Sequence, residues 1–264
     1  MKVFRGVPDI KGPSILMLGI FDGIHVAHQQ IIANAMKQSK TDNIPVILYS
    51  FLYRPNEVLR GQKANMLTSE AQKLAILSKL GIDAICIDKF DDQFAKTSAE
   101  EWLDNICMKL KPVHIFIGFN YHFGHLGQGD KQMLIANEQK YGYKVHIMEK
   151  LQENDRGISS TVIRNYILDG NIESANSLLG RKFTLPLELI NDDIDKYVFI
   201  KPERMILPGV GKYQATVEYF LDKKKVSCDS VLNIENTIFI LKDDLPNSQT
   251  LPKKIAVSLL HRIN

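Results

Sequence analysis

Cysteine is scarce in this sequence, and no two cysteines lie close together. The three present, Cys86, Cys107 and Cys228, form no CxxC pair. Neither a disulfide framework nor a zinc or other metal site is therefore expected. Long apolar runs are also lacking, because none approaches membrane-spanning length and the N-terminus has no apolar core typical of a signal peptide. We expect a cytoplasmic protein in a reducing environment, with no membrane as a partner.

An excess of charge of one sign is lacking as well. The chain of 264 residues carries 33 Lys and Arg against 30 Asp and Glu, a net charge of +3. Such a small charge does not indicate nucleic acid or an anionic membrane as a partner. With 45% hydrophobic and 24% charged residues, the composition is that of a globular protein with one large domain or two modest ones.

What is present is an alternation of apolar runs and amphipathic segments up to about residue 180. Five runs are expected to be strands, at 15–18, 44–51, 83–88, 113–117 and 143–148. Helices are expected at 29–40, 68–80, 98–110, 130–141, 160–169 and 172–179. Thr68 is expected to cap the second of these, and Ser98 with Glu101 has the spacing of a capping box. The alternation predicts an α/β fold, a parallel sheet covered on both faces, with ligands at the carboxyl ends of its strands.

Beyond residue 185 the pattern changes to strands joined by polar or proline-containing connections. These strands are expected at 187–190, 197–200, 211–221, 225–232, 237–241 and 255–260. Such a series predicts a small antiparallel sheet or barrel. We therefore expect an α/β domain over residues 1–185 and a small antiparallel β domain over residues 186–264.

The segment Gly19–His28 (GIFDGIHVAH) joins the first predicted strand to a helix. Its histidines, His25 and His28, are three residues apart on one face of the first helical turn. Unsatisfied N–H groups and a positive helix end suit a polyphosphate there. In the functional interpretation both imidazoles donate hydrogen bonds to nucleotide phosphates during attack at the α-phosphorus. The alternative is surface or capping histidines of an ordinary turn; the preceding Gly-x-Phe-Asp-Gly favours the functional interpretation.

A second segment, Ile158-Ser159-Ser160-Thr161-Val162-Ile163-Arg164, opens a predicted helix. Its hydroxyls and N–H groups lie at the helix N-terminus, and Arg164 follows one turn later. Together these groups could grip a leaving pyrophosphate. A plain serine N-cap with a solvated arginine explains the segment better when it is taken alone.

The third segment, Gly118–Gly124, follows the fourth predicted strand and is rich in aromatic residues and glycine. Asn120 offers an amide, while Phe119, Tyr121 and Phe123 offer flat surfaces. The functional interpretation is a pocket for a planar ring. The alternative is a structural loop whose aromatic side chains alternate into the core.

These three segments, in this order, closely resemble the adenylyltransferase module of prokaryotic FAD synthases, which is usually joined to a riboflavin kinase module. The resemblance covers residues 1 to about 185, and the joint pattern is highly specific although no single piece is. The family belongs to the HxGH nucleotidyltransferases, which share a Rossmann-like α/β fold. The resemblance implies transfer of AMP from ATP to the phosphate of FMN, giving FAD and pyrophosphate, with Mg²⁺. Class I aminoacyl-tRNA synthetases share the histidine motif, but we find no KMSKS-type loop here.

The resemblance also implies roles for individual residues. Catalytic roles are implied for His25, His28, Asn120, Ser159 and Arg164. Contacts with ATP are implied for both histidines and for Gly19, Phe21, Asp22, Gly23, Gly118, Ser159, Ser160, Thr161 and Arg164. Contacts with FMN are implied for Phe51, Arg54, Pro55, Asn120, Tyr121 and Phe123. No covalent enzyme intermediate is expected, because the FMN phosphate is itself the nucleophile.

Two positions depart from the family pattern inside this module. Ala27 stands between the motif histidines where the family has glycine, so a methyl group faces the place of close ATP approach. We expect a modest effect, because alanine is the next smallest residue and favours a helix. Arg54 stands in a loop where the family has the histidine of a PHP-like stretch. It would either add positive charge beside phosphates or point into solvent.

The larger departure lies in residues 184–264. They lack the Gly-Phe-Pro-Thr-Ala-Asn-like motif with which the family's kinase module helps to hold Mg-ATP. Only the segment 207–215 resembles that module's PGVYA strand, and Glu218 lies near where a catalytic acid would fall. We therefore expect a monofunctional FMN adenylyltransferase with a reduced kinase-like barrel. The open alternatives are a bifunctional enzyme, a non-catalytic flavin- or nucleotide-binding regulatory protein, and a nucleotidyltransferase for another phosphorylated metabolite.

Overall fold

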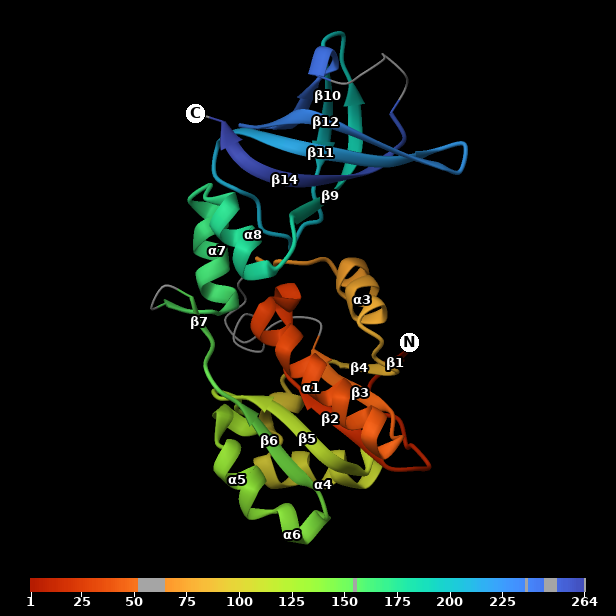
Figure 1. Ribbon diagram of the computed structural model, residues 1–264, viewed down its shortest axis with the longest axis vertical. Helices are drawn as coiled ribbons and strands as arrows, with labels where there is room; N and C mark the ends of the chain where they lie inside the picture. Colours follow the sequence, from red (N-terminus) through yellow and green to blue (C-terminus); the bar gives the residue numbers. More distant parts are fainter. Residues whose placement is uncertain (52–64, 154–155, 236, 245–250, 264) are drawn as a thin grey trace. The chain divides into compact units, whose positions relative to one another are not determined.

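The computed structural model describes residues 1–51, 65–153, 156–235, 237–244 and 251–263. Its contacts divide the chain into two compact units (Figure 1). The first, which we call the sheet unit, consists of the described residues within Met1–Ala64 and Glu70–Gly157. The second, the barrel unit, consists of Asn65–Ser69 and the described residues within Ile158–Asn264. The short segment 65–69 thus groups with a much later part of the chain.

The sheet unit is built on six parallel strands. They are β1 (Lys2–Arg5), β2 (Ser14–Leu18), β3 (Val46–Phe51), β4 (Ala84–Asp88), β5 (Pro112–Gly118) and β6 (Lys144–Met148). Their order across the sheet is β1-β4-β3-β2-β5-β6. β2 pairs with β3 on one side and with β5 on the other, so the order of succession reverses at β2. Ligands of open α/β sheets bind outside the carboxyl ends at such a reversal, here beside the loops after β2 and β5.

Helices cover both faces of this sheet. They are α1 (Val26–Asp42), α3 (Glu70–Lys79), α4 (Ala99–Leu110), α5 (Lys131–Ala136) and α6 (Glu138–Tyr141). β2 is fully buried, and because successive side chains point to opposite faces, Ile15 and Met17 enter one core while Leu16 and Leu18 enter the other. The first core contains residues of α1 and α3, and the second contains residues of α4 and α5. The predicted parallel α/β fold is confirmed.

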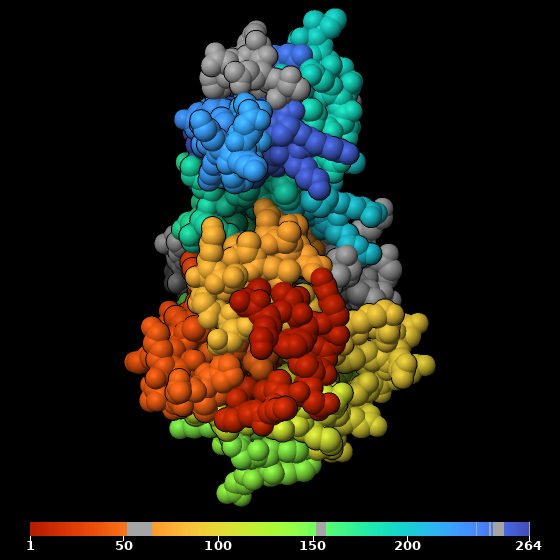
Figure 2. All heavy atoms as spheres, turned by 90° about the vertical axis from the view of Figure 1, so that its right-hand side faces the viewer, coloured from red at the N-terminus to blue at the C-terminus, as the bar shows by residue number. Residues whose placement is uncertain are grey.

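The edge strand β1 was not expected from the sequence. It pairs with β4 along one side only, and most of its residues are exposed, so it carries little apolar signal. Arg5 of β1 forms an ion pair with Glu70 at the start of α3. Figure 2 shows this N-terminal segment (dark red) on the surface beside the amber α3 region.

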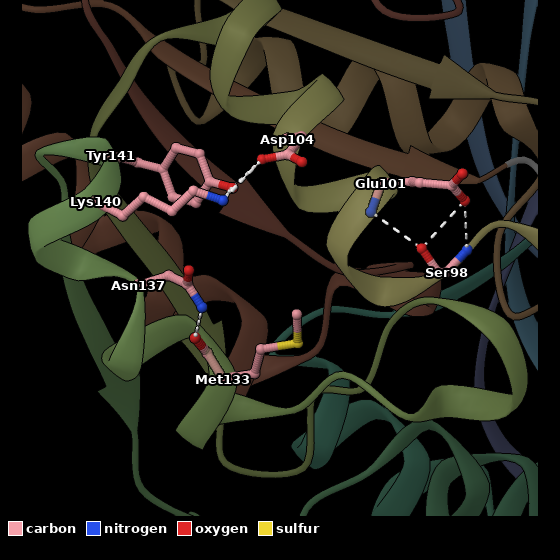
Figure 3. A network of polar contacts seen from close by, with 7 residues as sticks. All are labelled: Ser98, Glu101, Asp104, Met133, Asn137, Lys140 and Tyr141. Atoms are coloured by element: carbon pink, nitrogen blue, oxygen red, sulfur yellow. Dashed lines mark hydrogen bonds and ion pairs between the residues drawn. The ribbon is translucent and has the colours of Figure 1, made fainter.

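The ends of several helices follow local capping chemistry. The predicted capping box is confirmed, because Ser98 Oγ accepts from the N–H of Glu101 at 3.2 Å and Glu101 Oε2 accepts from the N–H of Ser98 at 3.1 Å (Figure 3). The helix expected at 130–141 is instead two short helices, α5 and α6. They meet at Asn137, whose amide donates to the carbonyl of Met133 at 2.9 Å (Figure 3).

Two predicted helix starts were wrong by a few residues. α1 begins at Val26, not at Gln29, because the motif turn feeds directly into the helix. α3 begins at Glu70, so Thr68 lies too early to be its N-cap. The side chain of Thr68 is buried, and its Oγ1 has no hydrogen-bond partner among the residues that the structure describes.

The barrel unit contains two helices and a closed antiparallel barrel. The helices are α7 (Ser160–Leu168) and α8 (Ile172–Leu179). The strands are β9 (Phe183–Asp192), β10 (Lys196–Ile200), β11 (Gly211–Leu221), β12 (Lys224–Ile234), β13 (Ile238–Leu241) and β14 (Lys254–Ile263), and η4 (Lys242–Asp244) is a 3₁₀ turn. The barrel closes in the order β10-β13-β12-β11-β14-β9, which confirms the predicted antiparallel β domain.

One hydrophobic core joins the barrel interior to both helices. It contains Ile163 and Ile167 of α7, Leu179 of α8, and Phe183 and Leu185 of β9. Apart from the segment 65–69, the contacts therefore place the boundary between the two units at Gly157 and Ile158. The division at residue 186, where we expect the nucleotidyltransferase module to end, stays a prediction.

Short elements lie in several of the described connections. They include the 3₁₀ turns η1 (Asp22–Ile24), η2 (Phe94–Lys96) and η3 (His125–Gly127) and the small hairpin of β7 (Gln152–Glu153) and β8 (Arg156–Gly157). Among the helices in the described part of the chain, none is long and apolar enough to cross a membrane.

Replacement of Ser98 by alanine is expected to destabilise the sheet unit by about 1 kcal/mol, because the N–H of Glu101 loses its acceptor. Trp102, the single tryptophan, lies on α4 and is buried, so its fluorescence in urea reports unfolding of this unit. Ser78→Ala, at an exposed position of α3, is the matched control and should change stability by less than about 0.5 kcal/mol. Equal urea midpoints for the two variants would contradict a stabilising capping box.

Candidate functional site

The turn between β2 and α1 has an unusual backbone. Phe21, Gly23 and Ile24 have positive φ angles of 51°, 78° and 42°. A left-handed conformation costs a non-glycine residue on the order of 1 kcal/mol. Phe21 and Ile24 are 2% and 0% exposed, and burial of such side chains contributes about 2 kcal/mol each, which offsets the strain. The fold therefore holds this turn in shape without a ligand.

The turn brings the two predicted histidines together. His25 occupies the N-cap position of α1, and His28 lies in its first turn. Their rings are stacked with centroids 3.7 Å apart and planes 18° apart, and Phe21 stacks on His28 at 4.6 Å. The side chain of His25 makes no capping hydrogen bond. His25 is therefore the N-cap residue by position, but its side chain does not cap α1.

The surroundings of His28 keep its imidazole neutral. Burial lowers the pKa of His28 well below 6.5, and the nearby His25 and Lys73 lower the pKa further by disfavouring a second positive charge. Its Nδ1 is buried and has no hydrogen-bond partner in the described part of the chain. A neutral imidazole has one N–H donor and one acceptor nitrogen, so His28 can donate to an oxygen without carrying charge.

A buried lysine behind the turn was missed by the sequence analysis. Lys73 of α3 is 5% exposed, and its Nζ donates to the carbonyl of Ile20 at 2.5 Å and to Ser50 Oγ at 2.7 Å. Burial lowers the pKa of Lys73 to about 8, although the carboxylates of Asp22 and Glu70 act in the opposite direction. The ammonium group remains mostly charged at neutral pH.

A signal for this lysine does exist in the sequence. α3 buries Lys73 together with Leu77, four residues later on the same helix face. A charged residue at an apolar position of an amphipathic helix calls for an explanation, because lysine is almost never fully buried without a partner. Its partners lie in the turn and at the end of β3, and their proximity cannot be read from helix periodicity.

The loop after β5 divides its predicted site residues between the surface and the core. Phe119 is 40% exposed and Asn120 is exposed, whereas Phe123 is 7% exposed. Phe123 packs on Trp102 with ring centroids 4.7 Å apart, and Tyr121, half-buried, stacks on Phe123 at 5.9 Å. Burial of the aromatic side chains thus increases along the loop from Phe119 to Phe123, while Asn120 remains accessible beside half-buried Gly118.

Phe51, at the end of β3, belongs to an aromatic cluster. Its ring makes edge contacts with Tyr49, Phe90 and Phe94 at centroid distances of 5.5, 5.6 and 5.2 Å. It is half-buried, so part of the ring can meet a ligand. The other two predicted FMN contacts of this loop, Arg54 and Pro55, lie outside the described residues.

The residues predicted to bind pyrophosphate lie at the start of α7 in the barrel unit. Ser159 is the N-cap and accepts from the N–H of Val162 at 3.3 Å, while Ser160 and Thr161 form the first turn. Arg164 is 7% exposed, and its Nε donates to the carbonyl of Asn65 at 2.7 Å. The expectation of a solvated arginine is therefore wrong. The predicted site residues thus fall into two groups, one in the sheet unit and one at the start of α7 in the barrel unit.

The described residues contain no group of three or more His, Cys, Asp or Glu side chains that could hold a metal ion.

Comparison with known sequences shows a consistent relationship. A protein-family model described as FAD synthetase matches residues 7–162. A bifunctional riboflavin kinase/FMN adenylyltransferase of Buchnera aphidicola (subsp. Schizaphis graminum) is 34% identical over 197 residues, which cover 72% of this chain and 63% of the relative. Proteins with the same description from Escherichia coli K12 and Listeria monocytogenes are 29% and 32% identical, over 73% and 68% of this chain. The matches span 64% and 57% of those two relatives, so less than two thirds of each is covered.

A solved structure resembles the whole chain. The crystal structure described as a macrolide-efflux protein from Streptococcus pneumoniae has a TM-score of 0.84 and covers 100% of this chain and 91% of its own. The two sequences are 22% identical. At this identity the likeness shows a shared fold and nothing about activity.

The lowered pKa of His28 predicts a loss of stability in acid. The unfolded chain takes up the proton near pH 6.5 but the folded chain takes it up only at lower pH, so stability falls as the pH falls below 6.5. Between pH 6.5 and pH 5 this group can remove at most about 2 kcal/mol. His28→Gln cannot titrate and is expected to lose less stability over this range, measured by urea denaturation with Trp102 fluorescence. The same loss in both proteins would show that His28 is not held neutral.

Proposed function

The chain belongs to the FAD synthetase family, and we propose that it transfers AMP from ATP to the phosphate of FMN, giving FAD and pyrophosphate. The observation that carries this proposal is the stacked pair of His25 and His28, of which His28 is held neutral, on a turn packed into the core at the carboxyl end of β2. This is the position in a parallel sheet where phosphate ligands meet a helix N-terminus.

In the proposed reaction an oxygen of the FMN phosphate attacks the α-phosphorus of ATP. A new phosphorus–oxygen bond forms, and the bond from the α-phosphorus to pyrophosphate breaks. Negative charge is spread over the oxygens of the transferring group, and fixed N–H donors of His25 and His28 stabilise it. The neutral imidazole of His28 suits this role because it keeps one N–H donor. Mg²⁺, bound with ATP, would supply charge neutralisation on the phosphates.

The other residues of the proposal position the two substrates. Because β5 pairs directly with β2, the loop bearing Asn120 follows a strand adjacent to the motif strand, which supports a contact of Asn120 with FMN. The exposed part of Phe51 and the half-buried Tyr121 offer surfaces for the flavin ring.

We assign the leaving pyrophosphate to the start of α7. Ser160 and Thr161 provide hydroxyls and N–H groups in the first turn of a helix, where anions are favoured. Arg164, buried and hydrogen-bonded to the 65–69 segment, supplies a fixed positive charge one turn later. A guanidinium in this setting favours phosphate oxygens.

We further propose that the barrel does not phosphorylate riboflavin. Residues 184–264 contain no Gly-Phe-Pro-Thr-Ala-Asn-like phosphate loop. The closed barrel has a continuous apolar core, which serves stability with or without a kinase site. A bifunctional enzyme and a non-catalytic flavin- or nucleotide-binding protein are the alternatives that the assay below distinguishes.

The purified protein, incubated with ATP and Mg²⁺, is expected to convert FMN into FAD and to release pyrophosphate. Chromatography of the flavins measures the conversion. Riboflavin in place of FMN is expected to give neither FMN nor FAD. Formation of FMN from riboflavin would overturn the monofunctional proposal. Tight binding of FMN or ATP without pyrophosphate release would favour the non-catalytic alternative.

His28→Ala is expected to lower kcat by roughly two to three orders of magnitude, as loss of a transition-state donor does elsewhere, with a much smaller change in the KM for ATP. His28→Gln, which retains an N–H donor of similar reach, should recover part of that loss. A kcat for the alanine variant within a few-fold of the parent protein would remove His28 from the proposed chemistry.

A further inference from the structure

A closed group of polar atoms lies beneath the motif turn. Lys73 Nζ donates to the carbonyl oxygen of Ile20 at 2.5 Å and to Ser50 Oγ at 2.7 Å, and Ser50 Oγ donates to the same carbonyl at 3.1 Å. Ser50 is 1% exposed and Lys73 is 5% exposed. The group therefore ties three elements together: α3, the end of β3, and the residue at which the chain leaves β2.

The charge in this group is not required to fill space. A methionine has nearly the same length and would occupy the same apolar position on α3 without the cost of burying an ammonium group. The carbonyl of Ile20 would keep a donor, because Ser50 already bonds to it. A buried charge retained where a neutral residue would suffice points to a role beyond stability.

The position of the carbonyl explains what that role can be. Ile20 immediately precedes Phe21, the first non-glycine residue of the turn with a positive φ, and the turn ends at His25. Fixing the Ile20 peptide therefore sets the direction from which the turn starts. Lys73 is also close enough to His28 to disfavour protonation of its imidazole, while Asp22 and Glu70 favour the charge on Lys73 itself.

We propose that Lys73 is a positioning residue for adenylyl transfer, whose ammonium clamps the carbonyl of Ile20 and thereby orients the stacked pair His25 and His28 toward the transferring phosphate. The hydrogen bond from Lys73 to the Ile20 carbonyl exists whatever the protein catalyses, whereas its expected effect on turnover rests on the proposed function. Lys73 acts through the turn and needs no contact with either substrate.

The test compares Lys73→Met with Lys79→Met, the same substitution at an exposed position of the same helix. Lys73→Met is expected to lower kcat for FAD formation about 10- to 100-fold, because small displacements of reacting groups cost this much. Its melting temperature should change little, because removal of a buried charge and loss of a favourable neighbour for the buried Asp22 act in opposite directions. Lys79→Met should change kcat by less than about twofold.

A second readout does not depend on activity. NMR titration of the protein labelled at histidine Cε1 gives the midpoint of His28, assigned by its absence from the His28→Gln spectrum. Loss of the Lys73 charge should move that midpoint upward, whereas Lys79→Met should leave it in place. If the parent protein makes no FAD, the proposed function fails while this titration still tests the clamp.

If the methionine variant does not fold, kcat and the His28 midpoint are measured on Lys73→Gln, which keeps an N–H donor but no charge. A folded variant at position 73 that retains both the parent kcat and the parent His28 midpoint would overturn the proposal. A fall in kcat with an unchanged midpoint and a lower melting temperature would reduce Lys73 to a structural residue and overturn it equally.

Discussion

The strand β2 is the constraint on which the sheet unit depends. It is buried on both faces, and it lies where the strand order reverses, so its carboxyl end has a neighbouring loop on each side. The left-handed turn that follows can be held in shape because Phe21 and Ile24 enter the core behind it. The two motif histidines therefore lie on or next to a turn that is packed into the core.

The proposed chemistry depends on this packing. Reactions of phosphates require little covalent participation by the protein and are accelerated by donors already in position. Stacking of His25 on His28 fixes both rings, and burial together with neighbouring positive charge keeps His28 neutral. A flexible loop bearing the same residues would have to be ordered at the expense of binding energy.

Much of this architecture could be predicted from the sequence, because near-continuous apolar runs and capping residues such as Ser98 are local signals. Helix periodicity did not identify β1, whose exposed edge has little apolar content, nor the break at Asn137. The site was predicted by motif, yet the buried state of Arg164 and the clamp by Lys73 depend on contacts between residues far apart in the chain. Composition and spacing carry no information about such pairs.

The segment 65–69 has a consequence for how this chain can be divided. Met66 bridges Met205, and Leu67, 1% exposed, belongs to the core of the barrel unit, although sequence on both sides of the segment belongs to the sheet unit. The chain therefore contributes to the barrel unit twice. A truncation between residues 157 and 158 would leave the apolar segment 65–69 without its partners in one product and remove it from the core of the other. Recombination at that single point would therefore not exchange either unit as a whole.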